Sequence, residues 1–262
     1  MAENQARPPL NQIYKEDLTK RTYPLVDETF NSIRDLSLSQ NFVTETGKPK
    51  GRIYDDAVLY TAVIEDGGSF EGKVVCDVGA RDGIFGSWLT REAAKVYVSD
   101  YFELWGKGTE HDLGQIEQWT NLWTSAAPNP DRLVCEHQDM TNLTYDDEMF
   151  DITISTSVIE HIFPQANYRG DMFAIREMVR VTKPGGYVLL TTDMIDGPSQ
   201  WYAGTYYYDS NDIFDRIINP SRCELVGTYD FNFGSSDNTD EFDRPNVGLV
   251  SSVIIVLKKP SN

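Results

Sequence analysis

Two kinds of apolar pattern run along this chain, and together they predict a sheet flanked by helices. Short β-branched runs alternate with longer segments whose apolar residues recur at helical spacing. Strands are predicted at Val74–Val78, Val96–Ser99, Leu133–His137, Phe150–Ser155, Tyr187–Thr192, Cys223–Phe231 and Leu249–Leu257. Helices are predicted at Leu25–Leu38, Arg52–Ile64, Ile84–Ala94, Leu113–Trp123, Gly170–Val181 and Asn211–Ile218. Strands that alternate with helices in this way indicate an α/β fold with a mainly parallel sheet.

The chain divides into a helical beginning and a longer α/β part. Its 262 residues fit one α/β domain with an addition. Residues 1–70 contain helix patterns but no chemical motif, so we expect an N-terminal helical extension or lid there. Residues 71–262 then form the main domain. The helices of the extension either cap a ligand site or only cover one edge of the sheet.

The stretch from Val74 to Trp88 is the most informative part of the sequence. A β-branched run contains Asp77, a turn with Gly79 and Gly83 follows, and a helical segment comes next. This order brings backbone N–H groups and a helix N-terminus to the carboxyl edge of a parallel sheet, where a nucleotide-like cofactor binds. The dinucleotide pattern G-x-G-x-x-G is not met, because Arg81 stands at its second glycine position.

The pattern that is present, D-x-G-x-x-x-G, resembles motif I of the class I S-adenosylmethionine (SAM)-dependent methyltransferases. The resemblance implies a doubly wound Rossmann-like sheet in the strand order 3-2-1-4-5-7-6, with strand 7 antiparallel. It also implies that SAM is the cofactor. Arg81 departs from the motif, which has a glycine there. The predicted motif I contacts with the cofactor come from Asp77, Gly79, Ala80, Arg81 and Gly83.

Three further segments match the family's order of motifs. Asp100 follows the second strand about 20 residues after the glycine turn, where an acid can accept hydrogen bonds from both ribose hydroxyls. Tyr101 could border the adenine. Asp139 and Met140, after the third strand, loosely match the family's adenine contacts. Against the cofactor role of Asp100 stands the simpler interpretation of a solvent-facing loop acid.

The run FDITISTSVIEHI, from Phe150 to Ile162, resembles motif IV of the small-molecule branch of the family, the methyltransferase type 11-like proteins. Ser155 and Thr156 are predicted cofactor neighbours, and Thr156 with Ser157 would line the floor of the cleft. His161 is the candidate catalytic base, because an imidazole titrates near neutral pH and can accept a proton from a hydroxyl. The alternative is that the Glu-His pair only holds the loop by hydrogen bonds.

A cluster of aromatic residues follows the fifth strand. It emerges at the same sheet edge as the cofactor turn, where this architecture binds its substrates. Its predicted substrate-wall residues are Trp201, Tyr202, Tyr206 and Tyr207. The equally weighted alternative is that the tyrosines close the rim of a core with their hydroxyls in water.

The net charge and the cysteine content limit the classes of partner and the cellular compartment that we expect. The formal net charge is -18, from 41 acids against 23 bases, and such a surface repels nucleic acid and anionic membranes. The three cysteines are widely spaced and lie in or beside apolar runs, as in reduced thiols of a cytoplasmic protein. No signal peptide or membrane-spanning run is visible, and the three histidines are too scattered to predict a metal site. The pattern indicates no particular oligomeric state.

The sequence therefore predicts an enzyme that transfers a methyl group from SAM to a small-molecule or sugar-like acceptor, with oxygen as the favoured target. Two alternatives stay open. Arg81 in the glycine turn leaves room for a non-catalytic module that binds SAM or a nucleotide. The acceptor could also be a protein rather than a small molecule. An NAD-dependent oxidoreductase is disfavoured by the failed glycine spacing.

Overall fold

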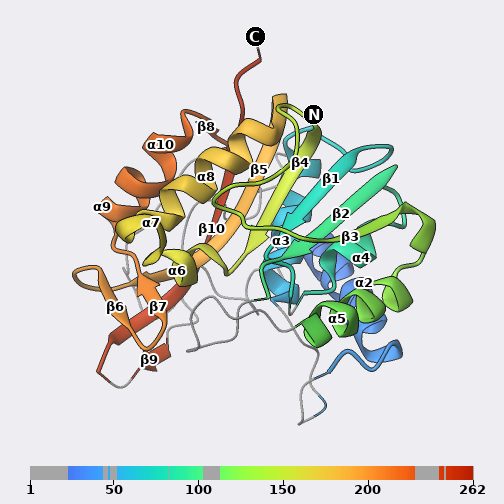
Figure 1. Ribbon diagram of the computed structural model, residues 1–262, viewed down its shortest axis with the longest axis horizontal. Helices are drawn as coiled ribbons and strands as arrows, with labels where there is room; N and C mark the ends of the chain where they lie inside the picture. The colour runs from blue at the N-terminus through green and yellow to red at the C-terminus, as the bar shows by residue number, and fades with distance from the viewer. Residues whose placement is uncertain are drawn as a thin grey trace.

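The architecture is seen in a computed structural model (Figure 1). The structure describes residues 23–43, 47, 52–81, 83–102, 113–227, 242–244 and 246–261. Everything stated below concerns these residues.

A twisted, mainly parallel sheet forms the centre of the molecule (Figure 1). Its strands are β1 (Val74–Val78), β2 (Lys95–Asp100), β3 (Leu133–His137), β4 (Phe150–Thr156), β5 (Thr182–Ile195), β8 (Glu224–Leu225), β9 (Phe242–Arg244) and β10 (Gly248–Lys258). Their order is β3-β2-β1-β4-β5-β10-β8, with β9 paired to β10. β10 is antiparallel to both β5 and β8. The predicted order 3-2-1-4-5-7-6 is confirmed, with β10 in the place of strand 7.

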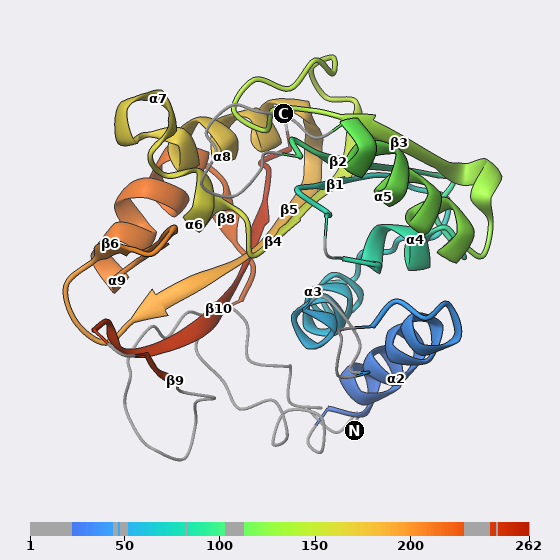
Figure 2. The same ribbon diagram turned by 60° about the horizontal axis from the view of Figure 1, so that its bottom comes forward.

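Helices cover both faces of the sheet (Figures 1 and 2). The main ones are α2 (Pro24–Ser39), α3 (Ile53–Glu65), α4 (Phe85–Leu89), α5 (Leu113–Ala126), α8 (Gly170–Val181) and the π-helical segment η2 (Ile213–Ile218). Shorter turns are η1 (Pro130–Arg132), α6 (Ile159–Ile162), α7 (Gln165–Tyr168), α9 (Ser210–Asp212) and α10 (Asn219–Ser221).

The alternation of side chains along each strand explains the two apolar layers. Val75 and Ile152 point to the layer that contains α2, α3, α4 and α5. Cys76 and Val78 point the other way, to the layer that contains α8 and η2. Both faces are buried, which is why the parallel strands contain continuous apolar runs rather than alternating ones.

Helices α2 and α3 share one apolar layer with the sheet. Val26 and Ile33 of α2 and Leu59 of α3 are fully buried in the same cluster as Val75 and Leu189. The division at residue 70 remains a prediction, and a test of it is given in the Discussion. No helix within the described ranges is both long and apolar enough to cross a membrane.

Four elements differ from the sequence prediction. The helix after the glycine turn ends at Leu89, because the chain must turn through residues 90–94 to enter β2. β5 begins at Thr182 rather than Tyr187, because its pairing with β4 continues across a register shift between Phe150 and Ile152. The helix predicted at Asn211–Ile218 begins with α9 and then widens into a π-helix. The strand predicted at Cys223–Phe231 appears as the short β8, and residues 228–231 lie outside the described residues.

The segment after β5 forms a hairpin that the sequence did not predict. β6 (Gln200–Tyr202) pairs antiparallel with β7 (Thr205–Tyr207). Its two-residue turn uses Ala203 and Gly204, both at positive φ, as tight hairpins require. The hairpin lies beside α6, at the end of the sheet where β4 terminates (Figures 1 and 2).

Candidate active site

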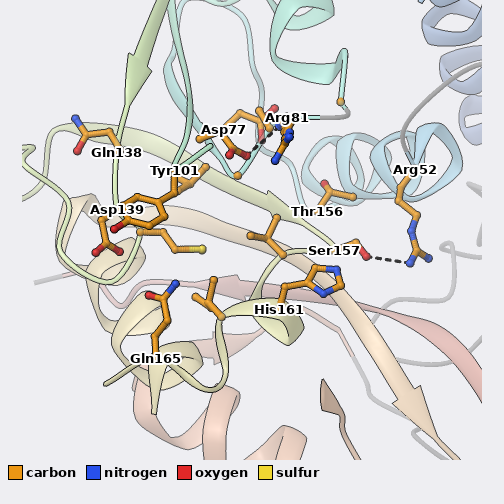
Figure 3. A pocket seen from close by; sticks show the side chains of 18 of the residues that line it. Arg52, Asp77, Arg81, Tyr101, Gln138, Asp139, Thr156, Ser157, His161 and Gln165 are labelled. Atoms are coloured by element: carbon orange, nitrogen blue, oxygen red, sulfur yellow. Dashed lines mark hydrogen bonds between the residues drawn. The ribbon is translucent and has the colours of Figure 1, made fainter. Parts of the chain in front are cut away.

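A cavity of about 690 Å³ opens at the carboxyl ends of β1, β2, β3 and β4. This is the edge where open α/β sheets bind their ligands. It contains most of the residues predicted for the site: Asp77, Gly79, Ala80, Arg81, Gly83, Asp100, Tyr101, Asp139, Met140, Thr156, His161 and Trp201. Figure 3 shows Asp77, Arg81, Tyr101, Asp139, Thr156 and His161 around this cavity.

The glycine turn shapes one wall of the cavity. Gly79 has φ +79°, and a Cβ there would lie 2.6 Å from the methyl groups of Val158. The N–H groups of Gly79 and Ala80 donate to the carbonyl of Ser99, at 2.8 and 3.0 Å. The N–H of Gly83 donates to the carbonyl of Ala80 at 2.7 Å. The prediction that this turn contacts the cofactor stays a prediction, and the three N–H groups named here bond within the protein. They fix the turn, and the turn brings bare backbone close to the cavity.

Asp77 connects β1 to the first turn of α4. Its Oδ2 accepts the N–H of Gly86 at 3.2 Å, and its side chain is buried. Burial raises the pKa of Asp77 to about 7; the Gly86 bond lowers it and the Asp100 charge raises it further. Asp77 therefore binds a proton far more readily than an exposed aspartate.

Asp100 and Arg81 are held by the turn. Asp100 accepts the N–H of Arg81 on Oδ2 at 3.2 Å and the N–H of Phe102 on Oδ1 at 2.7 Å. A carboxylate has about four acceptor positions, so these bonds leave capacity for ribose hydroxyls. The Arg81 guanidinium bonds to the side chain of Gln115 on α5. Arg81 thus borders the cavity while α5 holds its charged group.

The ends of β2 and β3 supply the flat part of the site. Tyr101 stacks on His137 with ring centroids 5.6 Å apart, and its carbonyl contacts His137 Nε2 at 3.0 Å. Asp139 Oδ1 accepts from the N–H and hydroxyl of Thr141, at 2.8 and 2.7 Å. These bonds fix the loop in which Met140 lies almost buried at the cavity wall.

The other end of the cavity is a polar network that involves the N-terminal helices. Arg52, just before α3, donates to Ser157 Oγ at 2.9 Å and to Asp193 Oδ1 at 3.1 Å (Figure 3). Burial alone would lower the pKa of Arg52, but the charges of Asp55, Asp193 and Glu160 outweigh it, so the pKa rises. Arg52 therefore stays a cation at the cavity wall.

Asp56 on α3 is a nearly buried carboxyl at the same end. Its Oδ1 accepts the hydroxyl of Thr156 at 3.0 Å. Burial raises its pKa well above the ordinary value, and the neighbouring Asp77 and Asp55 add to the shift. Asp56 and Asp77 thus border the same cavity from α3 and β1.

His161 lies between this network and the hairpin. Its Nδ1 is 2.9 Å from the carbonyl of Gly204, which can only accept, so Nδ1 carries the proton. Nε2 is then the proton acceptor of the neutral ring, 3.9 Å from Glu160 Oε1. Glu160 is fully buried and accepts hydroxyl bonds from Ser157 at 2.6 Å and Thr192 at 3.0 Å. Burial raises the pKa of Glu160.

Four predicted site residues do not line the cavity. Ser155 is fully buried in β4 and does not line the cavity. Tyr207 is buried against Ile195 and Val250. Tyr206 stacks on Phe163 and bonds to Asp212. Tyr202 faces the outside of the hairpin, where Asn246 donates to its hydroxyl. Their placement follows from strand alternation, which turns neighbouring aromatic residues to opposite sides.

The cavity also contains residues that sequence reasoning missed: Arg52, Asp56, Gln138 and Gln165. Two adjacent acids inside the apolar run of α3 were the available signal for Asp56, because unpaired carboxyls are rarely buried without a role. Within the described ranges, no group of three or more histidine, cysteine or acidic side chains could hold a metal ion.

The residues fit an adenosyl cofactor. The cavity volume lies within the range that small-molecule sites span. Asp100 has acceptor capacity for ribose hydroxyls, and a planar, partly apolar wall lies beside it at Tyr101 and Met140. Carboxyls from Asp56 and Asp77 suit the cationic part of SAM. Fold and site together define the class of α/β enzymes that bind a nucleoside-containing cofactor at the switch point of a doubly wound sheet.

Comparison with known proteins specifies the class. Residues 76–190, from β1 into β5, match the family model described as a methyltransferase domain. Residues 76–190 are therefore a methyltransferase domain, and the strand order supports the class I SAM-dependent methyltransferase fold. Its cofactor is SAM. A comparison with curated proteins gave no match.

Solved structures resemble the chain in fold at low sequence identity. The (4+2)-cyclase SpnF is 14% identical, with 98% of this chain and 100% of that chain covered and a TM-score of 0.57. The YcgJ protein from Bacillus subtilis is 13% identical, with coverages of 78% and 98% and a TM-score of 0.52. The Burkholderia thailandensis 1,6-didemethyltoxoflavin-N1-methyltransferase, solved with its acceptor and S-adenosylhomocysteine (SAH), is 16% identical, with coverages of 79% and 77% and a TM-score of 0.50.

Proposed function

We propose that this enzyme methylates a hydroxyl oxygen of a small molecule that binds between His161 and Trp201. The observation that supports it best is that one continuous cavity joins a cofactor end at β2 and β3 to a second polar end at α3, α6 and the hairpin. An acceptor at the second end would lie next to the donor within one volume. Holding two reactants in line can lower a barrier by roughly 7–11 kcal/mol.

The order of contacts sets the direction of the donor. Asp139 and Met140 would border the adenine, and Asp100 would bind the ribose. Asp56, Asp77 and Thr156 line the cavity near β1 and β4 and would hold the rest of the cofactor. When bound, SAM supplies a methyl group on a sulfonium, so the transfer chemistry belongs to the cofactor. The protein binds, orients and removes a proton.

His161 is the proposed general base. The Gly204 carbonyl holds its Nδ1 proton, so Nε2 can accept the proton of an acceptor hydroxyl. A neutral hydroxyl is a weak nucleophile, and proton removal is what an oxygen acceptor requires in addition to alignment. The hairpin therefore positions the base as well as closing the cavity.

The size and charge of the site favour a small acceptor. A volume of about 690 Å³ has to contain both donor and acceptor. With a net charge of -18, the chain repels polyanions such as nucleic acid. The Burkholderia thailandensis neighbour binds a small-molecule acceptor in the same fold, which supports this class of partner. A protein acceptor is the alternative, because a flexible peptide side chain could enter the same opening.

The test is transfer of a labelled methyl group from SAM to a panel of small hydroxyl compounds, amines and thiols. Label in a hydroxyl compound supports the proposal, and label only in amines or thiols would refute the choice of oxygen. If the protein binds SAH but no label moves to any compound or to protein extract, the site is a binding module. The resemblance to a cyclase makes that control necessary, because one fold supports different activities.

A further inference from the structure

An aromatic stack leads from the body of the protein to the cavity. Tyr206 and Phe163 lie parallel, with ring centroids 3.7 Å apart and an interplanar angle of 2°. Phe163 and Trp201 follow at 6.0 Å and 25°. Of these three rings only Trp201 lines the cavity. The stack therefore ends at the cavity, and Trp201 is its terminal ring.

An ion pair between Arg216 and the fully buried Asp171 lies against two rings of the stack. Arg216 lies over the Phe163 ring at 4.6 Å and over the Tyr206 ring at 5.6 Å. Its guanidinium donates to both oxygens of the buried Asp171, at 2.7 and 2.8 Å. The bidentate pair holds Arg216 against Phe163 and Tyr206, so the two rings that precede Trp201 in the stack are packed on a charged contact.

Trp201 is exposed beyond what packing requires. Its side chain is 42% exposed, although tryptophan is among the side chains that gain most from burial. It lies on the hairpin whose Gly204 carbonyl holds the Nδ1 proton of His161. An acceptor in contact with Trp201 would thus lie on the same element that orients the candidate base.

We propose that Trp201 is a specificity-determining residue that selects acceptors with a planar aromatic ring carrying the reactive hydroxyl. The ring of such an acceptor extends the Tyr206–Phe163–Trp201 stack by one member into the cavity. This inference rests on the proposed function and narrows its acceptor to hydroxyaromatic compounds. Sugar rings and alicyclic alcohols lack the flat π face that a further stacked ring needs.

The experiment measures binding to the protein loaded with SAH, by calorimetric titration. The probes are 2-naphthol, its saturated counterpart trans-decahydro-2-naphthol, and methyl β-D-glucopyranoside. We expect 2-naphthol to bind at least about five-fold tighter than either of the others, as one stacked pair contributes about 1 kcal/mol. Equal or tighter binding of the saturated alcohol or the glucoside overturns the proposal, and so does binding of none of the three.

Variants separate stacking from mere burial. Trp201→Phe keeps a flat ring and should retain the affinity for 2-naphthol within about two-fold, whereas Trp201→Leu and Trp201→Ala should lose about five-fold. Tyr202→Ala is the matched control, because Tyr202 is 40% exposed on the same hairpin but does not line the cavity. It should leave the affinity unchanged. Full affinity in Trp201→Leu, or an equal loss in Tyr202→Ala, contradicts the role of Trp201.

The same titration separates this inference from the proposed function. Loading with SAH is measured first. Failure of SAH to bind would refute the methyltransferase site itself, and loss of the planar preference with SAH bound would refute only the role of Trp201. Thermal unfolding of each variant checks that the hairpin substitutions leave the fold intact.

Discussion

At the scale of single residues, the site depends on side chains whose protonation and orientation are set by burial and by one carbonyl. His161 is the clearest case, since the carbonyl of Gly204 determines which ring nitrogen carries the proton. Asp77 is another, because burial alters its proton affinity without an ion-pair partner being needed.

Replacing His161 tests the base. We expect His161→Ala to lower kcat about 100-fold toward the hydroxyl acceptor found by labelled transfer, because general-base catalysis contributes at least that much. The affinity for SAH should stay unchanged, as measured by calorimetry. A kcat within about three-fold of that of the parent enzyme would show that His161 only holds the loop.

Asp77 makes stability depend on pH in a definite direction. Its pKa in the folded protein is about 7, against an ordinary value of 3.8. Below about pH 4 both states hold the proton. From there to about pH 7 the unfolded chain has lost it while the folded protein keeps it, so this group lowers the free energy of unfolding as pH rises. The upper limit of the loss is about 4 kcal/mol.

Asp77→Asn removes this dependence while keeping an oxygen that can accept the Gly86 N–H. The variant should therefore gain about 2–3 kcal/mol of stability over the parent protein as pH increases from 5 to 8, because part of the loss has already occurred at pH 5. Urea unfolding at the two pH values measures it. The raised pKa of Glu160 acts in the same direction in both proteins and cancels in the comparison. Loss of the Asp77 charge also lowers the pKa of Asp56, which adds to the gain in the same direction. Parallel pH curves for the two proteins would show that Asp77 titrates normally.

At the scale of elements, the glycine turn after β1 is both tightly packed and conformationally restricted. Gly79 combines a positive φ with a contact to Val158 that leaves no room for a Cβ. Gly72 has a similar φ of +69° but open space around it, so it serves as an internal control.

We expect Gly72→Ala to cost about 1–2 kcal/mol, the price of a left-handed conformation alone. Gly79→Ala should cost about 1–3 kcal/mol more, because overpacking adds to it. Val158→Ala in the Gly79→Ala background should recover part of the difference. Urea unfolding gives all three values. Equal losses at the two glycines would mean that Val158 moves aside freely.

The elements that the sequence predicted well are those with strong periodic patterns or family motifs. The strand order, the position of Asp100 after β2 and the helix α8 follow from them. The hairpin β6–β7 was not predicted, because three-residue strands are too short to show a period. For the same reason the sequence could not tell which aromatic residues face the cavity: a shift of one residue turns a side chain to the other side.

The sequence also could not predict the site residues that come from distant segments of the chain. Arg52 and Asp56 lie on a helix whose apolar pattern indicates packing, and only the fold places them next to Ser157 and Thr156. Likewise, the N–H groups of Gly79 and Ala80 point to Ser99, a bond that motif spacing does not reveal.

At the scale of the whole molecule, the N-terminal helices belong to the site as well as to the core. Arg52 bonds across to Ser157 and Asp193, and Ser252 of β10 donates to Asp55 at 3.0 Å. Lys258 pairs with Asp66 at 2.8 Å. These contacts connect α3 and its flanking residues to the end of β4, to β5 and to β10.

A chain that begins at residue 71 tests the proposed domain division. We expect it to lack cooperative thermal unfolding and to bind dyes specific for exposed apolar surface, because Val75 and Leu189 would lose the cover of α2 and α3. Circular dichroism and dye fluorescence measure both. Cooperative unfolding with SAH binding intact would instead show that residues 71–262 fold as an independent unit.

The account depends most on the adenosyl site between the β1 turn and Asp100, and calorimetric titration with SAM tests it most directly. We predict one equivalent bound, with affinity reduced about ten-fold in Asp100→Asn, because an amide accepts fewer ribose hydrogen bonds than a carboxylate. Asp35→Asn, on the exposed face of α2, should bind like the parent protein. The absence of binding at millimolar SAM, or equal affinity in Asp100→Asn, would contradict the account.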